Sequence, residues 1–263
     1  MKRNHKGLLL AAALFFAAMA AVSGYQLYKI SKEYKAGDED LRQMYAAMES
    51  AGERAKEKTP EMSVGDGQDE SREEGETAET GEDKEASDVR KKEEEARLLQ
   101  YRELKKANSD VTGWIRVDGT VIDYPVMQTP ETPDFYLKRG FDKKYSAYGM
   151  IYMDEDCDLD AGCPNFVLYG HHMKNGSMFK DVVRYKDEAY FKEHQFFSIY
   201  TPDREIRLKA VAAYYGEAQP IVRKTRFKSQ ESFDAFIHEM VKPCSFAEDV
   251  TYPARTLYTL VTC

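Results

Sequence analysis

The apolar and polar positions divide this chain of 263 residues into segments of different character. A run of small and apolar side chains extends from Leu8 to Val22. Residues 53–88 are polar and acidic, and large apolar side chains recur throughout the chain after about residue 89. A stretch with few apolar groups cannot bury enough surface to offset the entropy lost on ordering. The pattern therefore predicts one folded domain, residues 89–263.

Residues 7–24 are long and apolar enough for a membrane-spanning helix. As a helix they extend about 27 Å, close to the hydrocarbon thickness of a bilayer. Residues 1–6 are basic, which favours a cytoplasmic tail and a domain outside the cytoplasm. A cleaved signal peptide is the alternative, because Ala-x-Ala patterns occur at the end of the run. Tyr25 and Tyr28, at the expected membrane interface, favour an uncleaved signal anchor.

Residues 25–88 are predicted to connect this anchor to the domain. Between Ser31 and about Gly52, apolar side chains recur at helical spacing and predict a helix outside the membrane: Leu41, Met44, Tyr45 and Met48. Residues 53–88 are polar and acidic, with almost no large apolar side chain, which predicts a disordered linker.

The second half of the chain changes to the two-residue period of β-strands. Residues 89–107 predict an amphipathic helix that opens the domain. Seven strands follow, the first two joined by a hairpin turn at Asp118-Gly119: 113–117, 121–126, 149–153, 166–169, 197–200, 205–215 and 256–262. Helical segments are expected at Met178–Tyr185, Glu188–Glu193 and Gln230–Val241, the last with an apolar stripe typical of a core-facing helix. The fold class is mainly β with helical inserts.

Charge and cysteine usage exclude some function classes. Residues 61–90 hold twelve Asp and Glu against three Lys and Arg, so this segment alone exceeds the net charge of -8 of the whole chain. The remainder is nearly neutral, and it has no basic stripe typical of nucleic-acid binding. The four cysteines form no CxxC pair, which disfavours a zinc ribbon or a thioredoxin-type site. A disulfide between Cys157 and Cys163 is one alternative, and free thiols are the other.

Two strands end in residues that can perform nucleophilic catalysis. The last predicted strand ends at Cys263, and the strand 166–169 is followed by Gly170 and His171. A thiol is mostly protonated at neutral pH, and a neighbouring imidazole can accept or hold its proton. The alternative is a buried cysteine that packs as a small apolar group and a histidine bonded within a turn.

The residues around this pair resemble a known family. Thr259-Leu260-Val261-Thr262-Cys263 is similar to the TLxTC signature of sortases, and Tyr169-Gly170-His171 with the following 172–179 is similar to the histidine segment of class B sortases. The likeness continues upstream through 108–115 and 122–126 and covers about residues 90–263. It implies a sortase-type closed β-barrel of eight strands, with N-terminal helices and a long helix between the sixth and seventh strands.

The resemblance also implies a reaction. Cys263 would attack a threonine carbonyl in the C-terminal sorting signal of a surface protein and form a thioacyl enzyme. His171, which matches the family position better than His172, would protonate the leaving amine and deprotonate the incoming one. The partners would be surface proteins and an amine of a peptidoglycan precursor or a pilin, without a cofactor. The enzyme would be a cysteine transpeptidase or peptidase, anchored by a single span in a Gram-positive-type cell membrane.

Four further residues are candidates for substrate binding. Tyr169 would line the substrate groove, and Thr262 would contact the substrate or an oxyanion, with ordinary strand packing as its alternative. Tyr136 and Leu137 resemble a groove-lining segment of the family, and an apolar helical turn packed on the barrel is the alternative. The other histidines are interpreted as bystanders: His5, His194 and His238.

One family feature is not found in this sequence. Class B sortases carry a catalytic arginine on the strand after the nucleophile, whereas this sequence ends at Cys263. On that interpretation the last barrel strand is missing, and we expect weak or no activity. An inactive remnant that at most binds sorting-signal peptides is therefore the second hypothesis. A metal site at the histidines and cysteines is the third, and it is disfavoured because adjacent histidines point apart.

Overall fold

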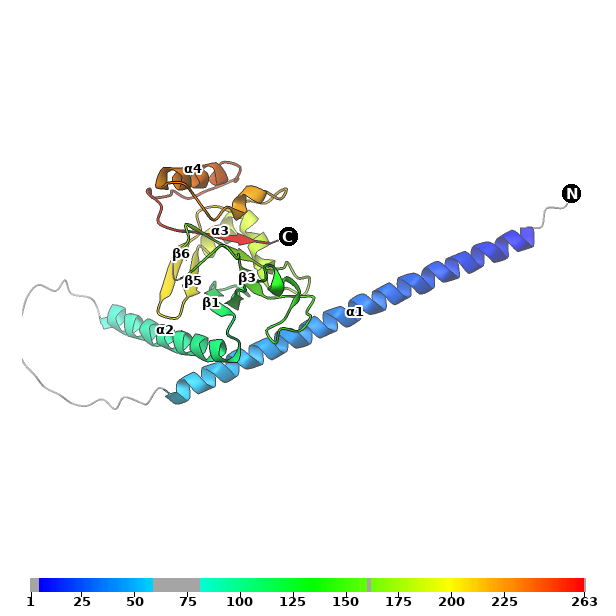
Figure 1. The fold of residues 1–263 in the computed structure, drawn as a ribbon, viewed down its shortest axis with the longest axis horizontal. Helices are drawn as coiled ribbons and strands as arrows, with labels where there is room; N and C mark the ends of the chain where they lie inside the picture. The colour runs from blue at the N-terminus through cyan, green and yellow to red at the C-terminus, as the bar shows by residue number, and fades with distance from the viewer. Residues whose placement is uncertain (1–4, 59–80, 160–161, 263) are drawn as a thin grey trace, which may run out of the picture.

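The computed structural model describes residues 5–58, 81–159 and 162–262. Two long helices lie against one side of a β-rich domain. They are α1 (His5–Lys58) and α2 (Gly81–Ala107). Figure 1 shows α1 running past the domain and projecting far beyond it toward the N-terminus.

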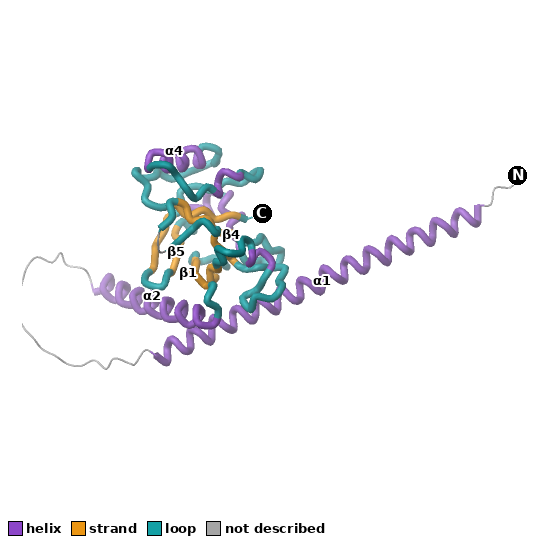
Figure 2. The backbone as a smooth tube through the Cα atoms, viewed as in Figure 1, coloured by secondary structure: helices purple, strands orange, loops and turns teal. Residues whose placement is uncertain are grey.

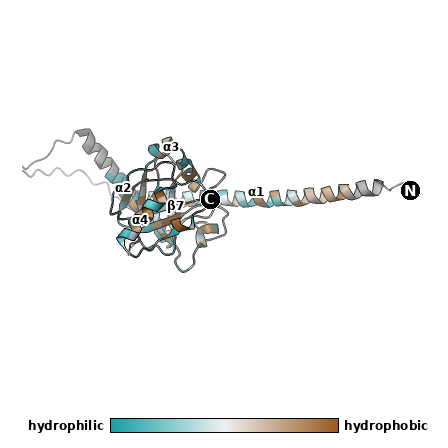
Figure 3. Cartoon of the chain, turned by 90° about the horizontal axis from the view of Figure 1, so that it is seen from above, coloured by the Kyte–Doolittle hydropathy of each residue, from teal (hydrophilic) through white to brown (hydrophobic). Residues whose placement is uncertain are grey.

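The projecting part of α1 is apolar and fully exposed. Leu14, Phe15 and Phe16 have 64%, 63% and 69% of their surface accessible, and Figure 3 shows this part of the helix as its most hydrophobic. Within the described residues, α1 contains the one segment, Ala12–Arg54, that is long and apolar enough to cross a membrane. An exposed apolar helix of this length is what the predicted anchor at 7–24 requires.

The second half of α1 packs against α2 and the domain. Met44, Met48 and Ala51 are almost completely buried, and so are Tyr101 and Leu104 on α2. The helical spacing predicted from the sequence in both segments is therefore confirmed. The side-chain amide of Gln100 also donates to the Met48 carbonyl oxygen over 2.6 Å.

The helices extend further into the acidic segment than predicted. Residues 53–58 belong to α1 and residues 81–88 to α2, so the prediction of disorder was wrong for both. These stretches are rich in Glu, Lys and Ala, which have high helix propensity, and each continues a helix already formed by neighbouring residues. Residues 59–80 of the predicted linker lie outside the described residues.

A single seven-stranded sheet forms the body of the domain, in the order β6-β5-β1-β2-β3-β4-β7. All seven predicted strands are present: β1 (Val111–Arg116), β2 (Asp123–Met127), β3 (Ile151–Met153), β4 (Asn165–Tyr169), β5 (Phe196–Tyr200), β6 (Glu205–Lys209) and β7 (Leu257–Val261). The pairs β2–β3 and β4–β7 are parallel, and the other neighbours are antiparallel. Figures 1 and 2 show the strands wrapping around a common centre.

The sheet is open, with β6 and β7 at its two edges. The described residues therefore form a seven-stranded part of the expected eight-stranded barrel. Strand β6 is also shorter than predicted. After Lys209 the chain leaves the sheet and pairs with a later loop, where Ala212 bridges Ala247 and the Glu248 N–H donates to the Val211 carbonyl oxygen over 2.7 Å.

Helical segments cover the ends of the sheet. The predicted helices at α3 (Glu188–Glu193) and α4 (Gln230–Val241) are confirmed with the same bounds, whereas η2 (Phe179–Lys186) is a 3-10 helix. Two further 3-10 turns are η1 (Phe135–Lys138) and η3 (Pro220–Arg223). Helix α4 lies between β6 and β7 in the chain, as the resemblance implies, and buries Phe233, Phe236 and Ile237 in a small cluster of its own.

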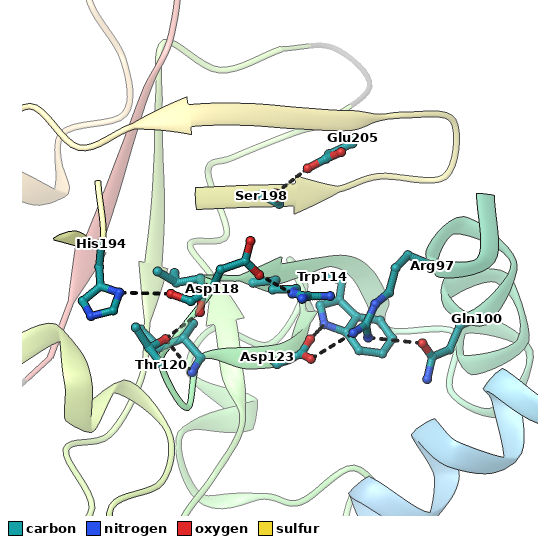
Figure 4. A network of polar contacts seen from close by, with 12 residues as sticks. Arg97, Gln100, Trp114, Asp118, Thr120, Asp123, His194, Ser198 and Glu205 are labelled. Carbon is teal, nitrogen blue, oxygen red and sulfur yellow. Dashed lines mark hydrogen bonds and ion pairs between the residues drawn. The ribbon is translucent and has the colours of Figure 1, made fainter. Parts of the chain in front are cut away.

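A polar network fastens α2 to the β1–β2 hairpin (Figure 4). The indole N–H of Trp114, which is fully buried, donates to Asp123 Oδ1 over 2.6 Å. Arg97 from α2 donates to Asp123 Oδ2 over 3.3 Å, and its guanidinium carbon lies 5.3 Å from the Trp114 ring centre. At the far end of the hairpin, His194 Nδ1 is 3.0 Å from the Asp118 carbonyl oxygen, so His194 holds a turn, in agreement with its interpretation as a bystander.

Candidate active site

The site is built on the parallel pair β4–β7. Five residue pairs are in register, from Asn165–Leu257 to Tyr169–Val261, and the Gly170 N–H donates to the Val261 carbonyl oxygen over 3.1 Å. The Thr259 hydroxyl donates to Asn165 Oδ1 over 2.7 Å. Paired side chains of the two strands therefore point to the same face of the sheet, with Asn165, Tyr169, Thr259 and Val261 on that face.

His171 begins the segment that follows β4, and it is partly exposed. Its Nε2 lies 2.8 Å from the carbonyl oxygen of Leu137 in η1. A carbonyl oxygen can only accept a hydrogen bond, so Nε2 carries the hydrogen in this arrangement. Nδ1 is then the ring nitrogen that can exchange a proton with a substrate.

The turn η1 that positions His171 is anchored by Tyr136. This side chain is only 1% exposed, donates to Asp110 Oδ2 over 2.8 Å and accepts from Asn108 Nδ2 over 2.9 Å. Burial raises the pKa of the Tyr136 phenol well above its ordinary value. Tyr136 thus packs in the core, as expected of an apolar helical turn, whereas Leu137 keeps 37% of its surface accessible. Of these two predicted groove residues, only Leu137 is available to a ligand in this structure.

Tyr169 lies on the face described above, with its hydroxyl fixed. It donates to Asp154 Oδ2 over 2.6 Å, and its ring centre lies 5.1 Å from that of Tyr152 on β3. Burial and then the Asp154 hydrogen bond raise the pKa of this phenol far above its ordinary value, so it stays protonated. The guanidinium carbon of Arg223, at the end of η3, lies 5.5 Å from the Tyr169 ring centre.

Thr262 points away from this face, because it directly follows Val261 and successive side chains of an extended chain alternate. Thr262 Oγ1 and His172 Nε2 are both buried, and neither has a hydrogen-bond partner among the described residues. The Thr262 hydroxyl is therefore buried on the face opposite to Tyr169.

Cys263 lies outside the described residues. The last paired residue of β7 is Val261, two positions before it. The three described cysteines are free thiols, so the alternative of a Cys157–Cys163 disulfide is not realised, although the two sulfurs are 3.5 Å apart. Among the described residues, no group of three or more His, Cys, Asp or Glu side chains is placed to hold a metal ion.

Sequence reasoning missed two residues of this region. Asn165 is fully buried, and its side-chain amide donates to the carbonyl oxygens of Val222 and Lys224 over 3.1 Å and 3.0 Å, which fixes η3 on β4. An asparagine at the start of an apolar strand is a signal that could have been followed, because a buried amide needs partners. Arg223 gives no comparable signal, because its position over Tyr169 depends on the path of the long loop between β6 and α4.

Comparisons with known proteins relate the chain to one group of enzymes. No family model matches it. Sortase B of Staphylococcus aureus is 28% identical over 165 residues, which are 62% of this chain and 67% of that protein, and sortase B of Listeria monocytogenes is 27% identical over the same length.

Solved structures extend this relation to the fold. The structure of Clostridium perfringens sortase B is 31% identical, covers 62% of this chain and 90% of its own, and has a TM-score of 0.57. The structure of S. aureus sortase B is 28% identical, covers 63% and 78%, and has a TM-score of 0.58. The sheet with its N-terminal helices is thus a sortase fold, and by sequence and structure together the chain belongs to the class B sortases.

Proposed function

We propose that this chain is a cysteine transpeptidase that cleaves a sorting signal at a threonine carbonyl through a thioacyl enzyme on Cys263. Class B sortases are transpeptidases of this general type. The register of β4 and β7 is the observation that supports this reaction on Cys263. Tyr169 pairs with Val261, and His171 would align with Cys263 if both strands continued in this register for two more residues.

The same register, if continued, would bring both groups to the face of the sheet that carries Tyr169. Side chains two residues apart on a strand share a face, so His171 follows Tyr169 and Cys263 follows Val261. Neighbouring parallel strands lie about 4.8 Å apart, a separation that an imidazole and a thiol bridge directly or across a substrate atom. This arrangement supports a nucleophile and its proton partner.

The reaction requires two acyl transfers. The Cys263 sulfur attacks the threonine carbonyl carbon, the amide bond breaks, and the departing amine takes a proton from His171. An incoming amine then attacks the thioester while His171 accepts its proton, and the thiolate leaves. The hydrogen bond from His171 Nε2 to Leu137 supports Nδ1 as the atom that moves both protons.

The acceptor is proposed to be a primary amine of a cell-wall precursor or a pilin. A related sortase B with 28% identity and a TM-score of 0.59 has been crystallised in complex with triglycine, a short peptide with a free amine. The substrate class of this chain would be surface proteins that carry a C-terminal sorting signal. The exposed apolar part of α1 supports anchoring in the cell membrane with the domain outside the cytoplasm.

A ligation assay with the full-length chain in detergent tests the proposal. The substrate is a peptide pool with one fixed threonine and randomised neighbours, triglycine is the acceptor, and mass spectrometry detects products in which the threonine is joined to the triglycine amine. We expect such products with the unmodified chain and none with Cys263→Ala, whereas Cys244→Ser serves as the control and keeps the activity. If the chain binds the peptides without forming product, it is the non-catalytic binder of the second hypothesis.

A further inference from the structure

Arg223 is held over the sheet face that carries Tyr169. The carbonyl oxygens on either side of it, those of Val222 and Lys224, both accept hydrogen bonds from the buried Asn165 amide. Asn165 is also bonded to Thr259 on β7. The backbone of Arg223 is therefore tied to both strands of the site, although Arg223 itself belongs to the loop between β6 and α4.

The guanidinium of Arg223 rests on the ring of Tyr169. Its central carbon lies 5.5 Å from the ring centre, within the range of a cation–π contact. The ring cannot swing away easily, because its hydroxyl is bonded to Asp154 and its other contacts include Tyr152. Tyr169 is the last paired residue of β4, so the guanidinium lies at the end of the parallel pair β4–β7, two residues before His171.

The hydrogen-bond donors of Arg223 remain accessible. The side chain is exposed, and in the described part of the chain it has no carboxylate partner within ion-pair distance. A guanidinium offers five N–H donors in a planar fork, which suits carbonyl oxygens of an extended peptide.

We propose that Arg223 binds main-chain carbonyl oxygens of the sorting-signal peptide beside the threonine and so sets the peptide along β4 and β7. This inference rests on the function proposed above, because it assigns a peptide-binding residue to the same site. Tyr169 is the platform that holds the guanidinium in place. Arg223 acts in binding, while proton transfer remains with His171.

Peptide binding measured in a Cys263→Ala background separates this inference from catalysis. The probe is the fixed-threonine peptide pool labelled with fluorescein, titrated with the full-length protein in detergent and followed by anisotropy. Arg223→Ala is expected to weaken binding roughly tenfold, the scale of a hydrogen bond to a charged group, and Arg223→Lys to weaken it less. Lys224→Ala is the matched control, because Lys224 is the next residue but lies over the Phe227 ring instead, and it should bind as the parent does.

Two outcomes would overturn the inference. If Arg223→Ala binds the peptides as tightly as its parent, Arg223 does not contact the peptide. If weaker binding is accompanied by a lower thermal unfolding midpoint, Arg223 serves only the fold. With Cys263 restored, Arg223→Ala should raise KM and change kcat less than about twofold. If peptide binding depends on Arg223 but the unmodified chain forms no ligation product, Arg223 is still a peptide-binding residue and the transpeptidase proposal is rejected. The two proposals can therefore fail separately.

A second, independent observation concerns the cysteines between β3 and β4. Cys157 and Cys163 are 3% and 8% exposed, and their sulfurs lie 3.5 Å apart. Cys163 Sγ is also 3.1 Å from the Asn165 carbonyl oxygen and 3.7 Å from that of Thr225, just after Arg223. The pair therefore lies where the loop after β3 meets the loop after β6, beside the face that carries Tyr169.

We infer that Cys157 and Cys163 are a site of reversible disulfide formation. The oxidant is a disulfide compound, such as oxidised glutathione or an extracytoplasmic protein disulfide. The two thiols lose two protons and two electrons and form one sulfur–sulfur bond, while the oxidant is reduced to two thiols through a mixed disulfide. The bond would fix the junction of the two loops.

Treatment of the full-length chain with oxidised glutathione, followed by alkylation and peptide mapping, tests this site. We expect a peptide that links Cys157 to Cys163, a mass lower by two hydrogens, reversal by dithiothreitol, and the same result in Cys244→Ser. Cys163→Ser should give no linked peptide. The site is rejected if both cysteines stay open to alkylation while Cys244 is oxidised, or if glutathione adducts are the final product.

Discussion

Two polar regions of the domain differ in how their side chains are paired. Where α2 meets the β1–β2 hairpin, one carboxylate, Asp123, accepts both the Trp114 indole N–H and the Arg97 guanidinium. At the end of β4 and β7, the Arg223 guanidinium is exposed, and His171 is partly exposed with its Nε2 bonded to the Leu137 carbonyl oxygen. The polar groups that hold the hairpin are paired internally, whereas the groups to which we assign a contact with a ligand stay accessible.

The largest expected effect falls on activity alone. Cys263→Ala should remove ligation completely, and His171→Ala should reduce kcat about 10²- to 10⁴-fold, the contribution typical of a general acid–base group. The thermal unfolding midpoint of both variants should stay within a few degrees of the parent. A loss of folding in His171→Ala would mean that its hydrogen bond to Leu137 is structural, which would contradict the division between the two regions.

The next effect falls on stability alone. Trp114 is completely buried, so Trp114→Ala should lower the free energy of unfolding by about 3–5 kcal/mol. Denaturant unfolding followed by circular dichroism measures this change. Trp114→Phe is the matched variant, because it keeps most of the ring but removes the N–H donor to Asp123, and it should cost less. An unchanged free energy of unfolding for Trp114→Ala would show that this region does not hold the fold.

Substitution of Asn165, which connects η3 to β4 and β7, should affect both stability and peptide binding. Asn165→Ala removes the bonds to Val222, Lys224 and Thr259, and a buried amide network of this kind contributes about 2–3 kcal/mol. We also expect a higher KM, because η3 no longer holds Arg223 over Tyr169. Thr259→Val removes one of the three bonds and should produce a smaller change in both. A loss of stability with an unchanged KM would separate Asn165 from peptide binding.

The smallest expected effect depends on pH. Burial alone would raise the pKa of Asp110, but hydrogen bonds from Lys143 and Tyr136 outweigh it and lower the pKa below its ordinary value. The ionised form therefore stabilises the fold above about pH 4, and this contribution is lost as pH falls through the lowered pKa. Asp110→Asn should cost about 1 kcal/mol at about pH 7 and nothing near about pH 2. A cost that is independent of pH would assign the effect to packing.

Much of the fold could be predicted from the sequence, because its signals are local. All seven strands follow from alternating or continuous apolar runs bounded by turn residues, and Gln230–Val241 follows from its apolar stripe. The acidic segment was predicted less well. Low apolar content predicts disorder, whereas helix propensity and the neighbouring packed turns continue both helices into it.

The site could be predicted only in part. The motifs that contain Tyr169, His171 and Cys263 are short and local, so the sequence alone is enough to propose them as site residues. The contact of Arg223 with Tyr169 joins residues 54 positions apart, and the bonds of Asn165 span 57 and 59 positions, so they depend on the path of a loop. Tyr136 shows the converse limit, because its neighbour Leu137 is exposed while Tyr136 itself is buried, a difference that the motif does not contain.

The proposed reaction requires His171 and Cys263 to act together on a threonine carbonyl. Mass spectrometry of the enzyme after brief exposure to the fixed-threonine peptides, without an amine acceptor, tests this requirement. We expect an added mass equal to the peptide up to its threonine, located on Cys263 by digestion and strongly reduced in His171→Ala. Acylation of Cys157, Cys163 or Cys244 instead, or an adduct on Cys263 that forms equally well without His171, would contradict it.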